Sequence, residues 1–251
     1  MTIQRQNKMG SSIEGMKNGA VKILVIVPAL NEEASLRGVI LGVRRALPEA
    51  DILVVNDGST DSTARIAREE GAVILDHPYN MGIGATMQTG FLYALTEGYD
   101  LAVQTDGDGQ HDPESLPSLI QPILEKRCNL VIGSRFLSEG GFKSTFSRQL
   151  GIRFFTCLLG IFTGKRVTDP TSGFRAMDRR VIELFSGEYP SDYPEVEALA
   201  SAHKEGLTFQ EVRTTMRHRQ GGTSSIGFLS ALYYMVKVTF AISIGLFRRI
   251  P

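Results

Sequence analysis

Residues 23–27 read Ile-Leu-Val-Ile-Val, an unbroken apolar run in which most residues are β-branched. A run without polar alternation indicates a strand that is buried on both faces, the kind found in parallel sheets. Four further strands are expected, and stretches with helical spacing of apolar residues separate them. The expected strands lie at 51–55, 73–75, 101–104 and 130–133, and the expected helices at 33–47, 62–70, 84–95 and 113–126. This alternation predicts an α/β fold with a mainly parallel central sheet flanked by helices.

The charge balance of the 251-residue chain narrows the function classes. Lys and Arg together number 27, and so do Asp and Glu, which makes the formal net charge zero. A protein that wraps nucleic acid normally carries a basic excess, so we expect no nucleic-acid partner. Hydrophobic residues make up 42% of the chain and charged residues 22%, which excludes a disordered protein.

Composition divides the chain into three parts. Residues 1–20 are polar and predict a flexible tail, whereas residues 21–225 carry the α/β pattern and its polar motifs. Residues 226–251 begin with a long apolar run and predict a membrane-associated helix.

The apolar run 226–247 contains one charge, Lys237, and is followed by Arg248. About 20 apolar residues suffice to span a bilayer. A charge near the middle suits equally well a helix that lies in the membrane interface, so both readings stay open. Residues 153–159 have the composition of an interfacial helix or of a core helix. We expect the protein to associate with a membrane.

Asp106, Gly107 and Asp108 follow the fourth expected strand and form the sharpest chemical feature. Because glycine lets the backbone bend tightly, both carboxylates can reach one divalent cation. Oxygen ligands suit Mg²⁺ or Mn²⁺, which would bridge to a diphosphate. Gln110 follows at once and offers another oxygen.

Polar residues also follow the first three expected strands. Asp57 stands too early to cap the next helix, so we expect it to contact the base or ribose of a bound nucleotide. Asn31 and Glu32 would hold either the nucleotide or their own loop. Gly84 would help to bring backbone amides near a phosphate. Ligands of such sheets bind beyond the carboxyl ends of the strands, where these residues stand.

Together these motifs resemble those of family-2 glycosyltransferases of the GT-A fold. The matching segments are 28–32, 55–61, 80–84 and 105–113, in matching order and spacing. Segments 133–136 and 171–175 resemble the dolichyl- or polyprenyl-phosphate sugar synthase branch. The resemblance covers about residues 21–225.

The resemblance implies an inverting, metal-dependent enzyme that transfers one sugar from a nucleotide-sugar to an undecaprenyl or dolichyl phosphate. It also implies a place on the cytoplasmic face of the cell membrane, with a small membrane protein as a candidate partner. The residues implied to bind the nucleotide-sugar are Pro28, Ala29, Asn31, Glu32, Asp57, Gly84, Asp106 and Gly107. The residues implied to hold Mg²⁺ or Mn²⁺ are Asp106, Asp108 and Gln110.

The same resemblance implies a set of acceptor-binding residues. Arginine suits this task because its planar fork grips phosphate oxygens in pairs. The residues implied to bind the acceptor phosphate are Arg135, Arg148, Arg219 and Ser224. Of these, Arg135 is also expected to take part in catalysis, as is Asp108 of the metal site. Ser225 stands where the branch usually carries a lysine.

The chemistry of the acceptor stays open between two classes. A phosphate is already ionised near neutral pH, whereas a sugar hydroxyl needs a general base within hydrogen-bond reach. Three carboxylates are candidate catalytic bases: Asp192, Glu195 and Glu197. The alternative activity is therefore transfer to a hydroxyl of a lipid-linked saccharide in surface-polysaccharide assembly. The alternative of another class is a nucleotide-sugar-binding module without catalysis.

Overall fold

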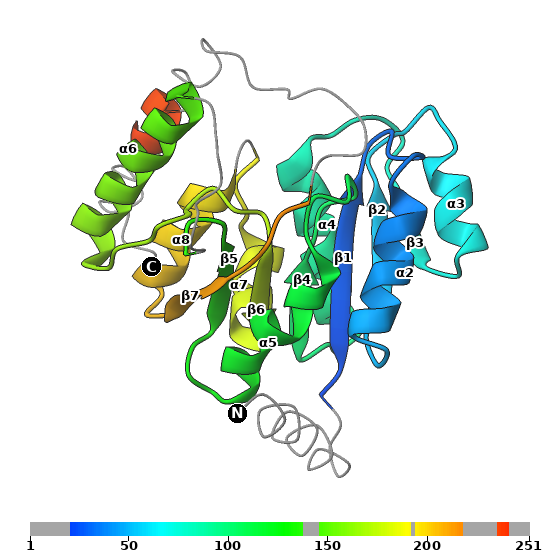
Figure 1. Ribbon diagram of the computed structural model, residues 1–251, viewed down its shortest axis with the longest axis horizontal. Helices are drawn as coiled ribbons and strands as arrows, with labels where there is room; N and C mark the ends of the chain where they lie inside the picture. The colour runs from blue at the N-terminus through cyan, green and yellow to red at the C-terminus, as the bar shows by residue number, and fades with distance from the viewer. Residues whose placement is uncertain (1–20, 138–145, 192–193, 218–234, 241–251) are drawn as a thin grey trace.

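The computed structural model describes residues 21–137, 146–191, 194–217 and 235–240, with only the backbone at 146–148. The described residues form one seven-stranded sheet between two layers of helices (Figure 1). The strands are β1 (Ile23–Ala29), β2 (Asp51–Asn56), β3 (Val73–Asp76), β4 (Leu101–Gln104), β5 (Leu130–Ser134), β6 (Arg175–Asp178) and β7 (Phe209–Arg213). The helices are α2 (Leu36–Ala46), α3 (Thr63–Glu69), α4 (Ile83–Thr96), the 3-10 turn η1 (Pro113–Ser115), α5 (Leu116–Leu124), α6 (Phe146–Thr163), α7 (Arg179–Gly187) and α8 (Pro194–Lys204).

The sheet has the strand order β3-β2-β1-β4-β6-β5-β7. Every neighbouring pair is parallel except the two that contain β6, which runs antiparallel to β4 and β5. The predicted mainly parallel sheet is thus confirmed, although β6 and β7 were not among the expected strands. Because β6 runs backwards, its first residue, Arg175, lies at the edge where β4 and β5 end, opposite Gln104 and Ile132.

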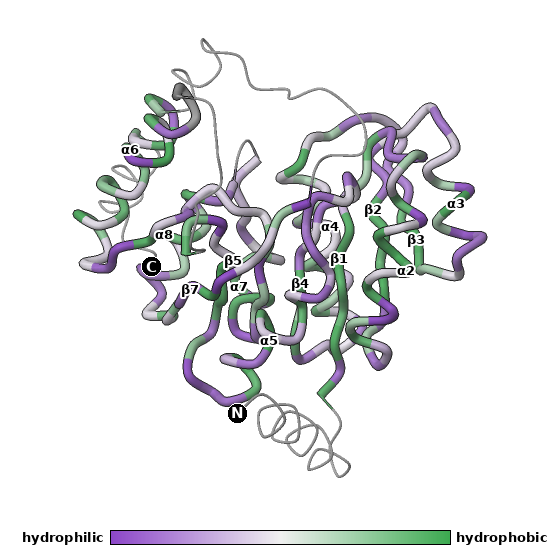
Figure 2. Tube along the Cα trace, in the orientation of Figure 1, coloured by the Kyte–Doolittle hydropathy of each residue, from purple (hydrophilic) through white to green (hydrophobic). Residues whose placement is uncertain are grey.

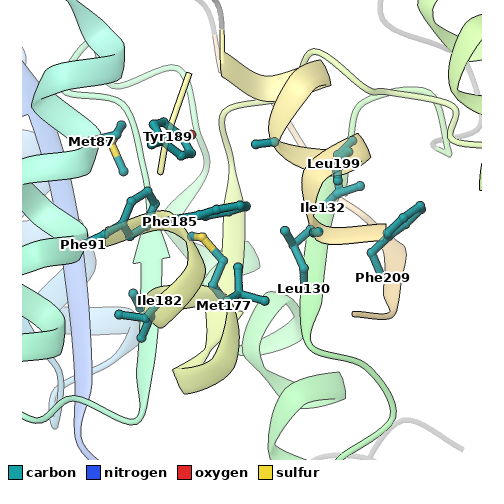
Figure 3. Close-up of a cluster of buried hydrophobic side chains, with 14 of the residues drawn as sticks. Met87, Phe91, Leu130, Ile132, Met177, Ile182, Phe185, Tyr189, Leu199 and Phe209 are labelled. Carbon is teal, nitrogen blue, oxygen red and sulfur yellow. The ribbon is translucent and has the colours of Figure 1, made fainter. Parts of the chain in front are cut away.

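The central strands are buried on both faces, as the apolar runs predict. On β1, Leu24 and Ile26 belong to one core cluster, whereas Val25 and Val27 belong to the other. The first cluster packs beneath α4, α6, α7 and α8 and contains the side chains of Figure 3. The second packs beneath α2, α3 and α5. The strands β1, β2 and β5 are correspondingly hydrophobic along most of their length (Figure 2).

The C-terminal region is described over 235–240, which are helical. Val238 is fully buried in the first core cluster, whereas Val236 and Phe240 are exposed. Among the residues that the structure describes, no helix is both long and apolar enough to cross a bilayer. Most of the predicted helix 226–251 and the whole predicted tail 1–20 lie outside the described residues.

Candidate functional site

The loops after β1, β2 and β4 meet at the carboxyl edge of the sheet. The backbone N–H of Asp57 donates to the Ala29 carbonyl at 2.9 Å. The loop after β4 presses on the loop after β1 at Gly107, where an added Cβ would stand 3.1 Å from the Pro28 carbonyl oxygen and 3.3 Å from Glu32 Cγ. A side chain at 107 would therefore force these neighbours to shift by a few tenths of an ångström. Ala29 and Pro28 are both buried at this junction.

Asp106 and Asp108 stand on the turn after β4. The Asp106 side chain is 41% exposed, whereas Asp108 is 7% exposed and accepts a hydrogen bond from the backbone N–H of Gln110 at 3.0 Å. Within the described residues, no cluster of three or more His, Cys, Asp or Glu side chains is arranged to hold a metal. Mg²⁺ usually takes only one or two carboxylates and completes its shell with water and phosphate, so a two-carboxylate turn fits such an ion.

His111 packs against this turn and binds its backbone. Its Nδ1 accepts a hydrogen bond from the Asp106 backbone N–H at 3.2 Å, and its ring stacks on Phe174 with centroids 4.7 Å apart. Burial lowers the pKa of His111 to about 4, although the Asp108 carboxylate opposes the shift. The ring is therefore neutral near pH 7, with its proton on Nε2, which lies 3.6 Å from Asp106 Oδ2.

Asp57 anchors the loop before α4. Its carboxylate accepts hydrogen bonds from His77 Nδ1 at 2.8 Å and from the backbone N–H groups of Met81 and Gly82 at 2.8 and 2.9 Å. Burial on its own would raise the pKa of Asp57, but these hydrogen bonds outweigh it and lower the pKa. Asp57, which is expected to contact a nucleotide base, thus also holds the loop before α4, a role that the sequence did not reveal.

Asn31 and Glu32 tie the loops after β1 and β2 together. Asn31 has a left-handed backbone (φ 56°), and its Oδ1 accepts from the Thr60 backbone N–H at 2.9 Å. The Glu32 backbone N–H donates to Thr63 Oγ1 at 2.8 Å, and its carboxylate accepts from the Ser35 hydroxyl at 3.0 Å. Of the two expectations, holding the nucleotide or holding the loop, the described contacts belong to the second.

Gly84 faces another part of the chain. Its backbone N–H donates to the Ser191 carbonyl at 3.1 Å. An added Cβ would stand 2.2 Å from the Pro190 carbonyl oxygen, a distance that no side chain tolerates. The amide expected near a phosphate is therefore engaged with the segment that leads into α8.

Arg135 is buried in an ion pair with Asp169. Its Nε and Nη2 donate to the two carboxylate oxygens of Asp169, each at 2.6 Å, and Nη2 also donates to Thr171 Oγ1 at 3.2 Å. Asp169 is fully buried, and its backbone N–H donates to Glu211 at 2.8 Å. The arginine expected to grip the acceptor phosphate thus holds the end of β5 against the turn before β6.

The remaining predicted residues divide by position. Glu195, in the first turn of α8, has a raised pKa because of burial, which the Arg175 charge partly offsets and the Asp106 charge reinforces. Glu197, two residues further in the same first turn, is partly buried. Arg148 lies in α6, where only its backbone is described, and Asp192, Arg219 and Ser224 lie outside the described residues. The last described residue before Arg219 is Arg217, whose guanidinium donates to Asp112 at 2.7 Å, four residues after Asp108.

Two buried polar residues at this edge received no binding or catalytic role from the sequence. Gln104, the last residue of β4, and Arg175, the first of β6, are each 1% exposed and lie opposite each other in the sheet. Arg175 belongs to a motif that pointed to the family, and Gln104 directly precedes the Thr105-Asp106 turn. The signal that could have indicated Gln104 is a polar residue at the end of an otherwise apolar strand.

Comparison with known proteins agrees with this geometry. A family model for glycosyl transferase family 2 matches residues 24–185. A UDP-N-acetylglucosamine–dolichyl-phosphate N-acetylglucosaminyltransferase from Methanococcus voltae is 32% identical over 76% of this chain and 83% of the relative. An undecaprenyl-phosphate mannosyltransferase from Micrococcus luteus is 32% identical over 82% of this chain and 88% of the relative.

A solved structure shares the fold. Glucosyl-3-phosphoglycerate synthase from Mycobacterium tuberculosis, in complex with Mn²⁺, UDP-glucose and phosphoglyceric acid, superposes with a TM-score of 0.73 at 22% identity. The match covers 94% of this chain and 84% of that chain.

The family model, the relatives and the shared fold identify the chain as a nucleotide-sugar-dependent glycosyltransferase with a GT-A-like fold. The chain belongs to glycosyl transferase family 2.

Proposed function

We propose that this enzyme transfers a single sugar from a nucleotide-sugar to a polyprenyl phosphate, with inversion and with Mg²⁺ or Mn²⁺, at the cytoplasmic face of a membrane. The observation that carries the acceptor is that relatives 32% identical over most of their length are named for transfer to dolichyl and undecaprenyl phosphate. Binding of the nucleotide-sugar donor is supported by the geometry, because two carboxylates flank Gly107 on a turn at the carboxyl edge of the sheet.

The metal would be held by Asp106 and Asp108, with Gln110 beside them. Asp106 is the exposed member of the pair, and His111 fixes its backbone from below. A divalent cation bound there would stabilise the negative charge that develops on the departing nucleoside diphosphate. Mn²⁺ in the solved mycobacterial synthase, which shares the fold, agrees with this proposal.

The nucleotide would lie along the loops after β1 and β2. Asn31 and Glu32 hold the shape of this edge, and Asp57 fixes the loop that follows β3. One lone pair of the Asp57 carboxylate remains for an N–H donor of a base, because it accepts three hydrogen bonds and offers about four positions.

Membrane association is supported by the outer face of α6. Leu150, Phe154 and Ile161 are exposed there, and Arg153 and Lys165 line the groove beside it. The groove measures about 880 Å³ and lies between α6 and the turn that follows it. Apolar side chains flanked by basic ones suit an interface with anionic lipid headgroups.

A second acceptor chemistry is favoured by one observation. The raised pKa of the Glu195 carboxyl and its electrostatic interaction with Asp106 favour this residue as a candidate general base. Transfer to the hydroxyl of a lipid-linked saccharide would use such a base, whereas transfer to a phosphate would not.

The donor is identified by incubating the detergent-solubilised protein and undecaprenyl phosphate with a panel of nucleotide-sugars. Mg²⁺ or Mn²⁺ is present, and both nucleotide release and the mass of the lipid product are measured. The proposal predicts that one sugar is added to the lipid and that EDTA abolishes the reaction. Undiminished transfer in EDTA would contradict the metal assignment.

A further inference from the structure

Gln104 and Arg175 form a cross-strand pair with unsatisfied polar atoms. They are directly opposite each other in the antiparallel β4–β6 ladder, so their side chains project from the same face of the sheet. Ala102 and Met177, two residues further along each strand, lie in the first core cluster, so this face is the one beneath α4, α7 and α8. Gln104 Oε1 and Arg175 Nη1 are buried without a hydrogen-bond partner.

The guanidinium of Arg175 is held in place by the turn before β6. Its Nε donates to the Ser172 carbonyl at 2.8 Å, and its Nη2 donates to the Pro170 carbonyl at 2.9 Å. Both contacts lie on one side of the planar group, so Nη1 is aimed away from the turn in a fixed direction. The unsatisfied donor is therefore preorganised rather than disordered.

This pair lies directly beside the turn assigned to the metal. A Cβ added to Gly173 would stand 3.3 Å from both Gln104 Nε2 and Asp106 Oδ1, so these two side chains share one neighbour. Glu195 of α8 interacts with the charges of both Arg175 and Asp106. Among the described side chains, no ion pair joins Glu195 to Arg175, and no bond to Glu195 satisfies Nη1.

The unpartnered acceptor and the unpartnered donor belong to residues that lie opposite each other on one face of the sheet. A hydroxyl group both donates and accepts, so one hydroxyl can satisfy Gln104 Oε1 and Arg175 Nη1 together. A phosphate or carboxylate only accepts, and it would leave Gln104 unsatisfied while lying near the Asp106 and Glu195 carboxylates. The pair thus matches a neutral, hydroxyl-bearing group better than an anion.

We propose that Gln104 and Arg175 bind a hydroxyl of the sugar that is transferred and thereby select a neutral sugar donor. The inference rests on the proposed function, because the sugar is attached to the diphosphate that the Asp106 turn would bind. Gln104 and Arg175 are both 1% exposed, so binding of the hydroxyl requires neighbouring side chains to move aside.

The test compares Gln104→Leu and Gln104→Met with the unaltered protein by calorimetric titration in Mn²⁺. The probes are UDP with UDP-glucose and GDP with GDP-mannose, and the pair that the unaltered protein binds is used. Loss of one hydrogen bond to the sugar should weaken nucleotide-sugar binding about tenfold. Binding of the bare nucleoside diphosphate should change less than about twofold, because it does not touch Gln104.

Gln88→Leu is the matched control. Gln88 is a partly buried glutamine of α4 whose side-chain amide donates to the Ser186 and Gly187 carbonyls, away from the site. The control should leave the ratio of the two dissociation constants unchanged. Melting temperatures show that each variant is folded, and Gln104→Leu should not melt below the unaltered protein because it removes an unsatisfied acceptor.

Deoxy analogues of the bound nucleotide-sugar give a second readout. Removal of the hydroxyl that the pair contacts should weaken binding to the unaltered protein and have little effect on Gln104→Leu. Equal losses for nucleotide and nucleotide-sugar, or an unchanged ratio in both Gln104 variants, would overturn the inference. Failure of the unaltered protein to bind any nucleotide-sugar would instead refute the proposed function itself, and the inference with it.

Discussion

Arg135, which was expected to bind the acceptor phosphate, forms a buried ion pair with Asp169. Asp169 is fully buried, and its carboxylate receives Arg135 through two hydrogen bonds of 2.6 Å. A carboxylate that loses such a partner remains as an uncompensated charge in the interior. Arg135 is consequently a stabilising residue whatever further contact it makes with an acceptor.

Arg135→Ala should lower the free energy of unfolding by about 3–5 kcal/mol. The loss of the bidentate partner of Asp169 is the physical reason, and urea unfolding followed by circular dichroism measures it. An exposed arginine in an ordinary surface ion pair, Arg65, provides the control, because Arg65→Ala should cost less than about 1 kcal/mol. An unfolding curve of Arg135→Ala that superposes on that of the unaltered protein would show that the pair carries no stability.

Asp108→Asn tests the metal site with little disturbance of the turn. The asparagine Oδ1 can still accept from the Gln110 backbone N–H, so the fold should be kept while the negative charge is lost. We expect at least a hundredfold fall in the rate of transfer, of the order found when one electrostatic contact to a transition state is removed.

The matched control for that substitution is Asp100→Asn at the opposite edge of the sheet. Asp100 accepts a hydrogen bond from the Lys22 backbone N–H at 2.8 Å, just before β1. The Asp100→Asn substitution should therefore leave turnover unchanged. Turnover of Asp108→Asn within twofold of the control would rule out its part in metal binding.

His111 predicts a dependence of stability on pH. Its pKa is about 4 in the folded chain and close to the ordinary 6.5 in the unfolded chain, so the unfolded state binds more protons between these values. Stability should therefore rise with pH across this window and be lost as the pH falls through it, by on the order of 3 kcal/mol. Urea titrations from pH 4.5 to 7 should give a shallower slope for His111→Gln, and identical slopes would contradict the burial of a neutral ring.

The sequence predicted which side chains gather at the carboxyl edge better than it predicted their partners. Motif positions at strand ends were enough to place Asp57 and Asp106 at one edge, since parallel strands end together. The partners of Arg135 and Gly84 are Asp169 and Ser191, which lie far along the chain. Only the tertiary packing of α6, α7 and α8 brings those residues to the site, and local patterns carry no record of it.

At the scale of elements, α6 shows how one helix serves two environments. Its Ile152, Phe155 and Leu159 are buried, whereas Leu150 and Ile161 are exposed. Of the two expectations for this segment, the core helix is confirmed on one face of α6, and the other face is exposed. Contact with lipid on the exposed face stays a prediction.

Leu150→Asp should weaken binding to anionic vesicles several-fold, because it places a charge on the face proposed to enter the headgroup region. Leu92→Asp is the matched control, since Leu150 and Leu92 are 53% and 54% exposed and Leu92 lies on α4. Co-sedimentation with vesicles of phosphatidylglycerol and phosphatidylcholine measures the effect. Equal binding by the two variants would refute the α6 face as the membrane contact.

The sequence did not predict β6 and β7, because neither strand has a continuous apolar run. β6 spans only four residues, Arg175–Asp178, and begins and ends with a charge. β7, Phe209–Arg213, lies at the edge of the described sheet, and only its first residue is buried. Neither presents the continuous apolar run that made β1, β2 and β5 recognisable. Their place in the sheet is set by tertiary contacts, to which β propensity is secondary.

At the scale of the whole molecule, the reversed strand β6 shapes the site. It starts at the edge where the parallel strands end, so Arg175 faces Gln104 and Phe174 stacks on His111. A sheet of uniformly parallel strands would place the start of that strand at the opposite edge. Within the described sheet, β6 is the strand that runs antiparallel, and it brings Phe174 and Arg175 to the turn that follows β4.

The acceptor is the central claim at this scale, and one measurement tests it most directly. The purified protein, its bound nucleotide-sugar and Mg²⁺ are incubated with undecaprenyl phosphate or with undecaprenol, which differ only in the phosphate. Product mass is read from the lipid fraction. The account predicts one sugar added to undecaprenyl phosphate and none to undecaprenol. The account would be contradicted if no sugar were added to undecaprenyl phosphate and transfer occurred only to the hydroxyl of a lipid-linked saccharide.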